Sequence, residues 1–198
     1  MIFDCDGVLV DSESASAAAW RAALARFDYH IDAVTFAGFV GTTDRALAVA
    51  FAARVGAGVE EVLDAAEQEM RLIAGQGLNA FPDALALVKR LTVPIGVASN
   101  SDRWRLEVVL SAAGVRPLFD VTVAGDEVAE PKPAPDVYLR VATLLGISPD
   151  DCVVIEDSPT GVVAARAAAM RVVAVRRGHF ADEVLMAADR IVDSLDEF

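Results

Sequence analysis

The chain has 198 residues, 55% of them hydrophobic and 24% charged, so a packed core is expected and general disorder is excluded. This length suits one domain with a large insertion, or two small domains. The formal net charge of −13 argues against nucleic acid or an anionic membrane as a partner. An anionic substrate would therefore need local positive charge within its site, which a metal ion and a lysine or arginine could supply.

Short apolar runs recur along the chain and read as β-strands. They do not alternate with polar residues, which is typical of parallel strands covered on both faces. Helical patterns lie between them, so right-handed crossovers and an α/β fold with a doubly wound parallel sheet are predicted. The predicted strands are residues 1–4, 94–99, 121–124, 152–156 and 172–175, and the predicted helices between them are 83–91, 102–113, 135–145 and 159–169.

Residues 13–80 break this alternation and contain no convincing strand. Amphipathic helices separated by glycine-rich joints indicate an α-helical domain inserted after the first strand. The core domain would then consist of residues 1–12 and 81–198. Its aromatic residues favour a helical core over a ligand site. The helices are expected at 14–27, 44–55 and 59–74, and the aromatic residues are Trp20, Phe27, Phe36, Phe39 and Phe51.

The cysteine count and the N-terminal residues indicate where in the cell the protein is expected. Cys5 and Cys152 are too few for a disulfide framework, and both lie beside apolar runs, which predicts two buried thiols in a reducing environment. An acid at position 4 argues against a signal peptide, and no apolar run is long enough to span a bilayer. We expect a soluble cytoplasmic protein, and a monomer because no long heptad pattern is visible.

Two acids, Asp4 and Asp6, follow the first apolar run. Residues two apart in a strand share a face, and Gly7 permits a sharp turn that frees the carboxylates from the sheet. This layout suits a carboxylate nucleophile and a carboxylic acid that act on one substrate. Taken alone, an Asp-x-Asp pair at a strand end is more often simply solvated.

Three further polar segments are expected at the carboxyl ends of predicted strands, where ligands bind in open parallel sheets. Ser99 and Asn100 could bind a phosphate oxygen, although Ser99 or Ser101 could equally cap the next helix.

Lys132 stands among three prolines, which gives either a rigid mount for an ammonium that meets an anion or a stiff surface turn. The fourth segment ends in Glu156 and Asp157. These are hard oxygen ligands suited to Mg²⁺, while Asp157 or Ser158 could also cap a helix.

These motifs, in this order, resemble those of the haloacid dehalogenase superfamily, in the branch that holds phosphoglycolate phosphatase and β-phosphoglucomutase. The resemblance covers nearly the whole chain, and the helical insert resembles the family's cap domain. The short first strand departs from the family and would weaken the centre of the sheet rather than the chemistry. The segment from Asp4 to Ser12 is similar to the first motif, Ser99 to the second, Lys132 to the third and Glu156-Asp157 to the fourth.

The resemblance implies a Mg²⁺-dependent phosphatase acting on a small phosphorylated metabolite, such as a sugar phosphate or phosphoglycolate. Asp4 would attack phosphorus and form an aspartyl-phosphate, and Asp6 would protonate the leaving alcohol and then activate water. The resemblance also implies which residues bind the phosphoryl group and the metal ion. Ser99, Asn100 and Lys132 would bind the phosphoryl group, and Mg²⁺ would be held by the Asp4 carboxylate, the Asp6 carbonyl and Asp157, with Glu156 in support.

Other functions compete with hydrolysis. A β-phosphoglucomutase would carry a cap histidine where this chain has Ser16, which favours plain hydrolysis. A haloacid dehalogenase does not need an acid at position 6, because halide leaves without a proton. An inactive binding module would have no reason to keep Asp4, Asp6, Lys132 and Asp157 together. In the insert, Gly41, Thr42 and Arg45 are candidates for substrate contact, although an exposed arginine at a helix start fits Arg45 at least as well.

Overall fold

The computed structural model describes residues 1–39 and 42–198, and for residue 33 the backbone alone. The chain divides into two compact units, one formed by Met1–Asp11 with Asn79–Phe198 and the other by Ser12–Leu78. The boundaries expected from the sequence lie at residues 12–13 and 80–81. The interpretation of the two units as a catalytic core and a cap stays a prediction.

The first unit contains a six-stranded sheet with the order β3-β2-β1-β4-β5-β6, in which all neighbouring strands are parallel. The predicted doubly wound α/β fold is therefore confirmed. The chain first winds outward from β1 through β2 to β3, then crosses back to β4 and winds the other way. The strands are β1 (Ile2–Phe3), β2 (Gly96–Ala98), β3 (Val121–Val123), β4 (Val153–Glu156), β5 (Arg171–Val175) and β6 (Arg190–Val192).

The central strand β1 is short. Ile2 aligns with Gly96 on one side and Val154 on the other, and the Asp4 N–H extends the pairing by donating to the Ile155 carbonyl at 2.9 Å. The edge strand β6 is not predicted by the sequence, because Arg190-Ile191-Val192 is too short to show a hydrophobic period.

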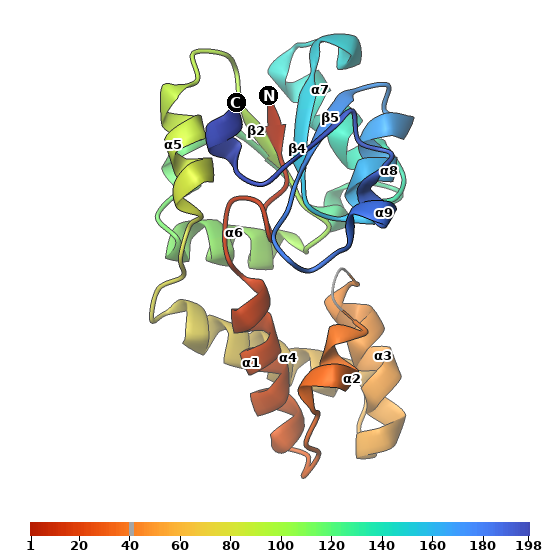
Figure 1. Cartoon of the computed structure of the whole chain (residues 1–198). Helices are drawn as coiled ribbons and strands as arrows, with labels where there is room; N and C mark the ends of the chain where they lie inside the picture. The colour runs from red at the N-terminus through yellow and green to blue at the C-terminus, as the bar shows by residue number, and fades with distance from the viewer. Residues whose placement is uncertain (40–41) are drawn as a thin grey trace. The chain divides into compact units, whose positions relative to one another are not determined.

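Helices cover both faces of this sheet. In Figure 1, α5 and α6 lie on one side of the strands, and α7 and α8 lie on the other. Proline at the first turn of α5 and α8 is compatible with a helix start, because the missing N–H would be unpaired there anyway. The helices are α5 (Pro82–Arg90), α6 (Arg103–Ala112), α7 (Asp136–Leu145), α8 (Pro159–Ala167) and the short α9 (Asp182–Leu185), with 3₁₀ turns at Arg116–Leu118, Gly125–Glu127, Pro149–Asp151 and Leu195–Glu197.

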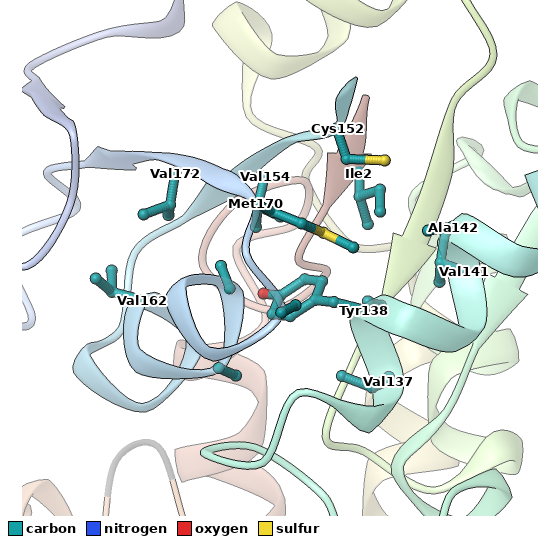
Figure 2. Packing of buried hydrophobic residues seen from close by; sticks show 14 of the residues in the cluster. Ile2, Val137, Tyr138, Val141, Ala142, Cys152, Val154, Val162, Met170 and Val172 are labelled. Carbon is teal, nitrogen blue, oxygen red and sulfur yellow. The ribbon is translucent and has the colours of Figure 1, made fainter. Parts of the chain in front are cut away.

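The core between the sheet and helices α7 and α8 is built from aliphatic side chains around one tyrosine. Figure 2 shows Tyr138 of α7 next to Met170, with Ile2 of the central strand nearby. Tyr138 is completely buried, so its hydroxyl requires a hydrogen-bond partner. On the other face of the sheet, Phe3 packs edge-on against Phe119 with ring centroids 6.0 Å apart.

In the second unit, the regular elements of the described residues are all helices, and they have a core of their own. Phe51 is fully buried and contacts the rings of Tyr29 and Phe39, and the Trp20 Nε1–H donates to Asp44 Oδ1 at 2.9 Å. The prediction that the aromatic residues of this segment form a helical core is confirmed. The helices are α1 (Glu13–Ala25), α2 (Ala33–Ala37), α3 (Asp44–Val55) and α4 (Val59–Ala74), of which α2 is too short to predict.

Two further expectations concern the thiols and membranes. Cys5 and Cys152 are both buried and free, as the sequence predicts. Across the described ranges, no helix combines the length and the apolar character needed to cross a membrane.

Candidate active site

The predicted site residues of the first unit gather at the carboxyl ends of β1, β2 and β4. Asp4 follows β1, Ser99 follows β2, and Asp157 follows β4. β1 and β4 are neighbours, and the direction of winding reverses between them. Such a switch point leaves a crevice outside the strand ends, where α/β proteins bind their ligands.

Lys132 is the central cation of this cluster. Its Nζ lies 2.5 Å from Asp4 Oδ1 and 2.7 Å from Glu156 Oε1, and it also donates to the Ala98 carbonyl at 3.1 Å. The Lys132 side chain is only 3% exposed. The alternative of a stiff surface turn with a solvated lysine is therefore wrong, and this part of the chain delivers a buried ammonium to the carboxylates.

Asn100 fixes the backbone of Lys132. Its side-chain Nδ2 donates to the Lys132 carbonyl at 3.0 Å, and its Oδ1 accepts from the Lys132 N–H at 2.7 Å. The peptide bond between Lys132 and Pro133 is cis. The Asn100 amide is thus used to hold the lysine segment, a role different from the phosphate contact expected of it.

Glu156 accepts hydrogen bonds on both carboxylate oxygens. Oε1 accepts from Lys132 Nζ and from the Tyr138 hydroxyl at 2.7 Å each, and Oε2 accepts at 2.9 Å from the N–H of Asp157 and from the N–H and hydroxyl of Ser158. Gly161 lies so close that a Cβ there would come within 1.6 Å of Oε1. A metal ion bound by Glu156 would compete with these donors.

Three buried carboxylates offer a place for a metal ion. One oxygen from each of Asp4, Glu156 and Asp157 lies within 4.8 Å of the others. Gly7 makes this approach possible, because it has φ +81° and a Cβ there would come within 2.1 Å of Asp157 Oδ2. Two of these carboxylates, Asp4 and Glu156, share the Lys132 ammonium, and a buried excess of charge of one sign is costly. This donor set and its excess negative charge fit a hard divalent cation such as Mg²⁺.

The pKa values in this cluster reflect burial and mutual attraction. Burial raises the pKa of Asp4 to about 8, Glu156 and Asp6 add to the shift, and Lys132 opposes it. Burial also disfavours charge on Lys132 and Glu156. Attraction to Asp4 and Glu156 outweighs burial and raises the pKa of Lys132, and attraction to Lys132 outweighs burial and lowers the pKa of Glu156. Asp4 therefore needs added positive charge to act as a carboxylate at neutral pH.

Asp6 lies beside the hydroxyls that follow β2. Ser99 Oγ donates to Asp6 Oδ2 at 3.3 Å and Ser101 Oγ donates to the same oxygen at 3.1 Å, while Arg105 Nη2 lies 3.9 Å from Asp6 Oδ1. The residue that caps α6 is Asp102, so neither serine is its N-cap. Ser158 does cap α8, by accepting from the Gly161 N–H at 3.1 Å, as one of the alternatives predicted.

The candidate substrate residues of the second unit are described only in part. Gly41 lies outside the described residues. Thr42 is exposed and its hydroxyl donates to the Phe39 carbonyl at 2.7 Å. Arg45 Nη2 forms an exposed ion pair with Glu60 Oε1 at 2.8 Å. Exposed pairs of this kind are worth less than about 1 kcal/mol, so Arg45 could exchange this partner at little cost.

The motifs do not mark every residue that contributes to the site. Tyr138 could have been found as a tyrosine on the apolar face of a predicted helix, where its hydroxyl needs a partner. Arg105 is also buried, one turn before Val109 on the same helix face. Arg177 follows β5 at the site's edge of the sheet, and the strand-end rule that led to the four motifs extends to it.

Comparison with known proteins places this arrangement in a family. Residues 1–169 match the family model of the haloacid dehalogenase-like hydrolases. The chain is 36% identical over 190 residues to Protein SUPPRESSOR OF QUENCHING 1 of Arabidopsis thaliana, with 89% of this chain but only 18% of that protein covered. It is 33% identical over 180 residues to fructose-1-phosphate phosphatase YqaB of Escherichia coli, covering 89% of this chain and 95% of the relative. The crystal structure of CbbY from Rhodobacter sphaeroides in complex with phosphate matches with a TM-score of 0.89 and 26% identity, over 99% of this chain and 94% of that one.

The family model covers most of the chain, and the Escherichia coli relative is covered almost completely. The chain therefore belongs to the haloacid dehalogenase-like hydrolases, and the family expected from its four motifs is confirmed.

Proposed function

We propose that the chain is a Mg²⁺-dependent phosphomonoesterase that hydrolyses a small phosphorylated metabolite, such as a sugar phosphate or a phosphoglycolate-like compound, through an aspartyl-phosphate. The observation that carries the proposal is the contact of Asp4 with Lys132 beside Asp157 at the switch point of the sheet. The named activity of YqaB, a fructose-1-phosphate phosphatase, and the phosphate in the CbbY structure support the same chemistry.

In this proposal Asp4 is the nucleophile. Its carboxylate oxygen attacks phosphorus, the bond from phosphorus to the substrate oxygen breaks, and the phosphoryl group remains on Asp4. Asp6 gives its proton to the leaving alcohol and then accepts a proton from the water that hydrolyses the aspartyl-phosphate. Lys132 and Ser99 bind phosphoryl oxygens and offset their charge, which is where most of the rate enhancement in phosphoryl transfer arises.

Asp4, the Asp6 carbonyl and Asp157 would hold Mg²⁺, with Glu156 in support. The ion would neutralise charge on the phosphoryl oxygens and favour the ionised form of Asp4. Asn100 acts indirectly, by holding Lys132 in place. We assign Thr42 and Arg45 of the helical unit to substrate choice, as a cap that excludes water from the reaction. Gly41, the third candidate, is outside the described residues.

The first test is release of phosphate from p-nitrophenyl phosphate and from a panel of phosphorylated metabolites, with and without Mg²⁺. Asp4→Asn should lose at least about 1,000-fold in kcat, because an amide cannot form the phosphoenzyme; this corresponds to about 4 kcal/mol of barrier. Asp151→Asn serves as the matched control, since Asp151 is an exposed acid outside the cluster. Near-normal turnover by Asp4→Asn would remove Asp4 from the role of nucleophile.

The same panel separates hydrolysis from mutase activity. A mutase would exchange sugar phosphate isomers through a sugar bisphosphate without net release of phosphate. Ser16, a small buried side chain at the start of α1, stands where the resemblance places the mutase histidine. Stoichiometric phosphate release is therefore the expected result.

A further inference from the structure

Arg177 lies in the loop after β5 and reaches back to the loop that follows β1. Its Nε donates to the Gly7 carbonyl at 3.1 Å and its Nη2 lies 3.4 Å from the Val8 carbonyl. The Arg177 side chain is only 10% exposed. Residues far apart in the sequence are thus joined at the edge of the sheet where the candidate active site lies.

The guanidinium of Arg177 is itself held on two other sides. Asp83, at the start of α5, accepts from Nη1 and Nη2 at 3.0 Å each, which is the forked geometry that arginine forms with a carboxylate. The ring of Phe81 lies under the guanidinium, 4.0 Å from its central carbon. A lysine could supply the charge but neither the fork nor the stacking. We call Arg177, Asp83 and Phe81 the arginine brace.

The loop after β1 depends on this brace for part of its hydrogen bonding. Its internal bonds run from the Gly7 N–H to the Val10 carbonyl and from the N–H groups of Leu9 and Val10 to the Cys5 carbonyl. The Gly7 and Val8 carbonyls accept instead from Arg177. The brace therefore fixes the two carbonyl groups that the internal bonds leave out, in a turn that has a positive φ at Gly7.

The position of this turn matters for the site. Gly7 directly follows Asp6 and packs against the carboxylate of Asp157. We propose that Arg177 is a positioning residue. It fixes the loop after β1 and so holds Asp6 in its position relative to Asp4 and Asp157. Displacements of about 1 Å in such a constellation can cost on the order of 100-fold in rate. The kinetic consequence rests on the proposed phosphatase function, whereas the effect on the loop does not.

Arg177→Gln is the test variant and Arg176→Gln its matched control. Arg176 is the neighbouring arginine and is also paired with carboxylates, Asp182 and Asp193, but it makes no contact with the loop after β1 among the interactions of the described residues. Hydrogen exchange at the amides of Leu9 and Val10 reports on the loop directly. We expect exchange there at least about 10-fold faster in Arg177→Gln and unchanged in Arg176→Gln.

Kinetics separate positioning from general stability. At a temperature well below the Tm of each variant, Arg177→Gln should lower kcat about 10-fold or more, with KM within about twofold, because substrate still binds while the reacting groups are misplaced. Arg177→Lys should show the same pattern in weaker form, and it replaces Arg177→Gln if that variant does not fold.

Two results would overturn the proposal. One is equal exchange at Leu9 and Val10 in the Arg177 and Arg176 variants, and the other is a kcat no lower than that of Arg176→Gln. If the wild-type protein hydrolyses no phosphate ester, the proposed function fails, and the exchange comparison then decides by itself whether Arg177 fixes the loop.

Discussion

At the residue scale, buried charges of opposite sign contact one another in the candidate site. The Lys132 ammonium lies between the carboxylates of Asp4 and Glu156 and also donates to a backbone carbonyl. Removing one partner of a buried ion pair costs about 3–5 kcal/mol, because the other charge remains buried and uncompensated. Residues that only adjust the geometry of this group should have smaller effects.

Tyr138→Phe tests that expectation. The change keeps the ring next to Lys132 Nζ, at 4.8 Å from its centroid, and removes only the hydroxyl that donates to Glu156. Glu156 keeps its other donors, so the free energy of unfolding should fall by about 1 kcal/mol, the usual net value of a hydrogen bond. A fall in kcat of no more than about threefold is expected, equivalent to about 0.6 kcal/mol.

Urea unfolding and steady-state kinetics measure the two effects of Tyr138→Phe. Tyr29→Phe is the control, since Tyr29 belongs to the helical unit and its ring contact with Phe51 survives the change. A loss of activity as large as that of Asp4→Asn would show that the Tyr138 hydroxyl has a more direct role than holding Glu156.

The residues of the site differ in how far the sequence predicts them. Asp4, Asp6, Lys132 and Asp157 stand at strand ends or beside prolines, where a local pattern marks them. A local pattern could mark Tyr138 and Arg177 as candidates, but it does not identify their partners, which lie 18 and 170 residues away, respectively. Asn100 was expected to contact phosphate, and its bonds to the Lys132 backbone become visible only in the folded chain.

At the scale of secondary-structure elements, Asp83 joins three parts of the first unit. From the first turn of α5 it pairs with Arg177 after β5 and accepts from the Leu195 N–H at 2.9 Å. Burial opposes its charge, but the bonds from Arg177 and Leu195 outweigh burial and lower the pKa of Asp83. The ionised carboxylate therefore belongs to the folded state.

The pH dependence of stability should reflect this pairing. Because the pKa of Asp83 is lower in the folded state than in the unfolded state, its contribution is complete above the unfolded value of about 3.9 and is lost as pH falls through the folded value. Urea unfolding at pH 5 and at pH 3 should show that the free energy of unfolding falls less in Asp83→Asn than in the wild type. An equal fall in the two proteins would mean that Asp83 does not contribute to the loss of stability in acid.

Elements were predictable where they are long or strongly patterned. The helices α3 and α4 have the predicted bounds, and α5 to α8 and the parallel strands lie within a few residues of expectation. The α-helices and strands that were not predicted are α2, α9 and β6, with five, four and three residues. Segments this short show no full hydrophobic period, so tertiary packing decides their structure.

At the scale of the whole molecule, the net charge of −13 affects any metal-binding experiment. Cations in general screen the repulsion among surface carboxylates and stabilise the folded chain without occupying a site. A specific site differs because its effect depends on particular ligands and on the affinity of one ion.

Mg²⁺ at about 100 times its dissociation constant should stabilise the folded chain by about 2.7 kcal/mol, because it binds the folded state only. For a protein of this size that corresponds to a rise in Tm of roughly 5–10 °C. Scanning calorimetry should show this rise with MgCl₂ in the wild type and a much smaller one with NaCl at equal ionic strength. Asp157→Asn removes one of the three clustered carboxylates, so its response to MgCl₂ should fall to that seen with NaCl. An equal rise with both salts in the wild type would show that the ion acts by screening, and would contradict a magnesium site among Asp4, Glu156 and Asp157.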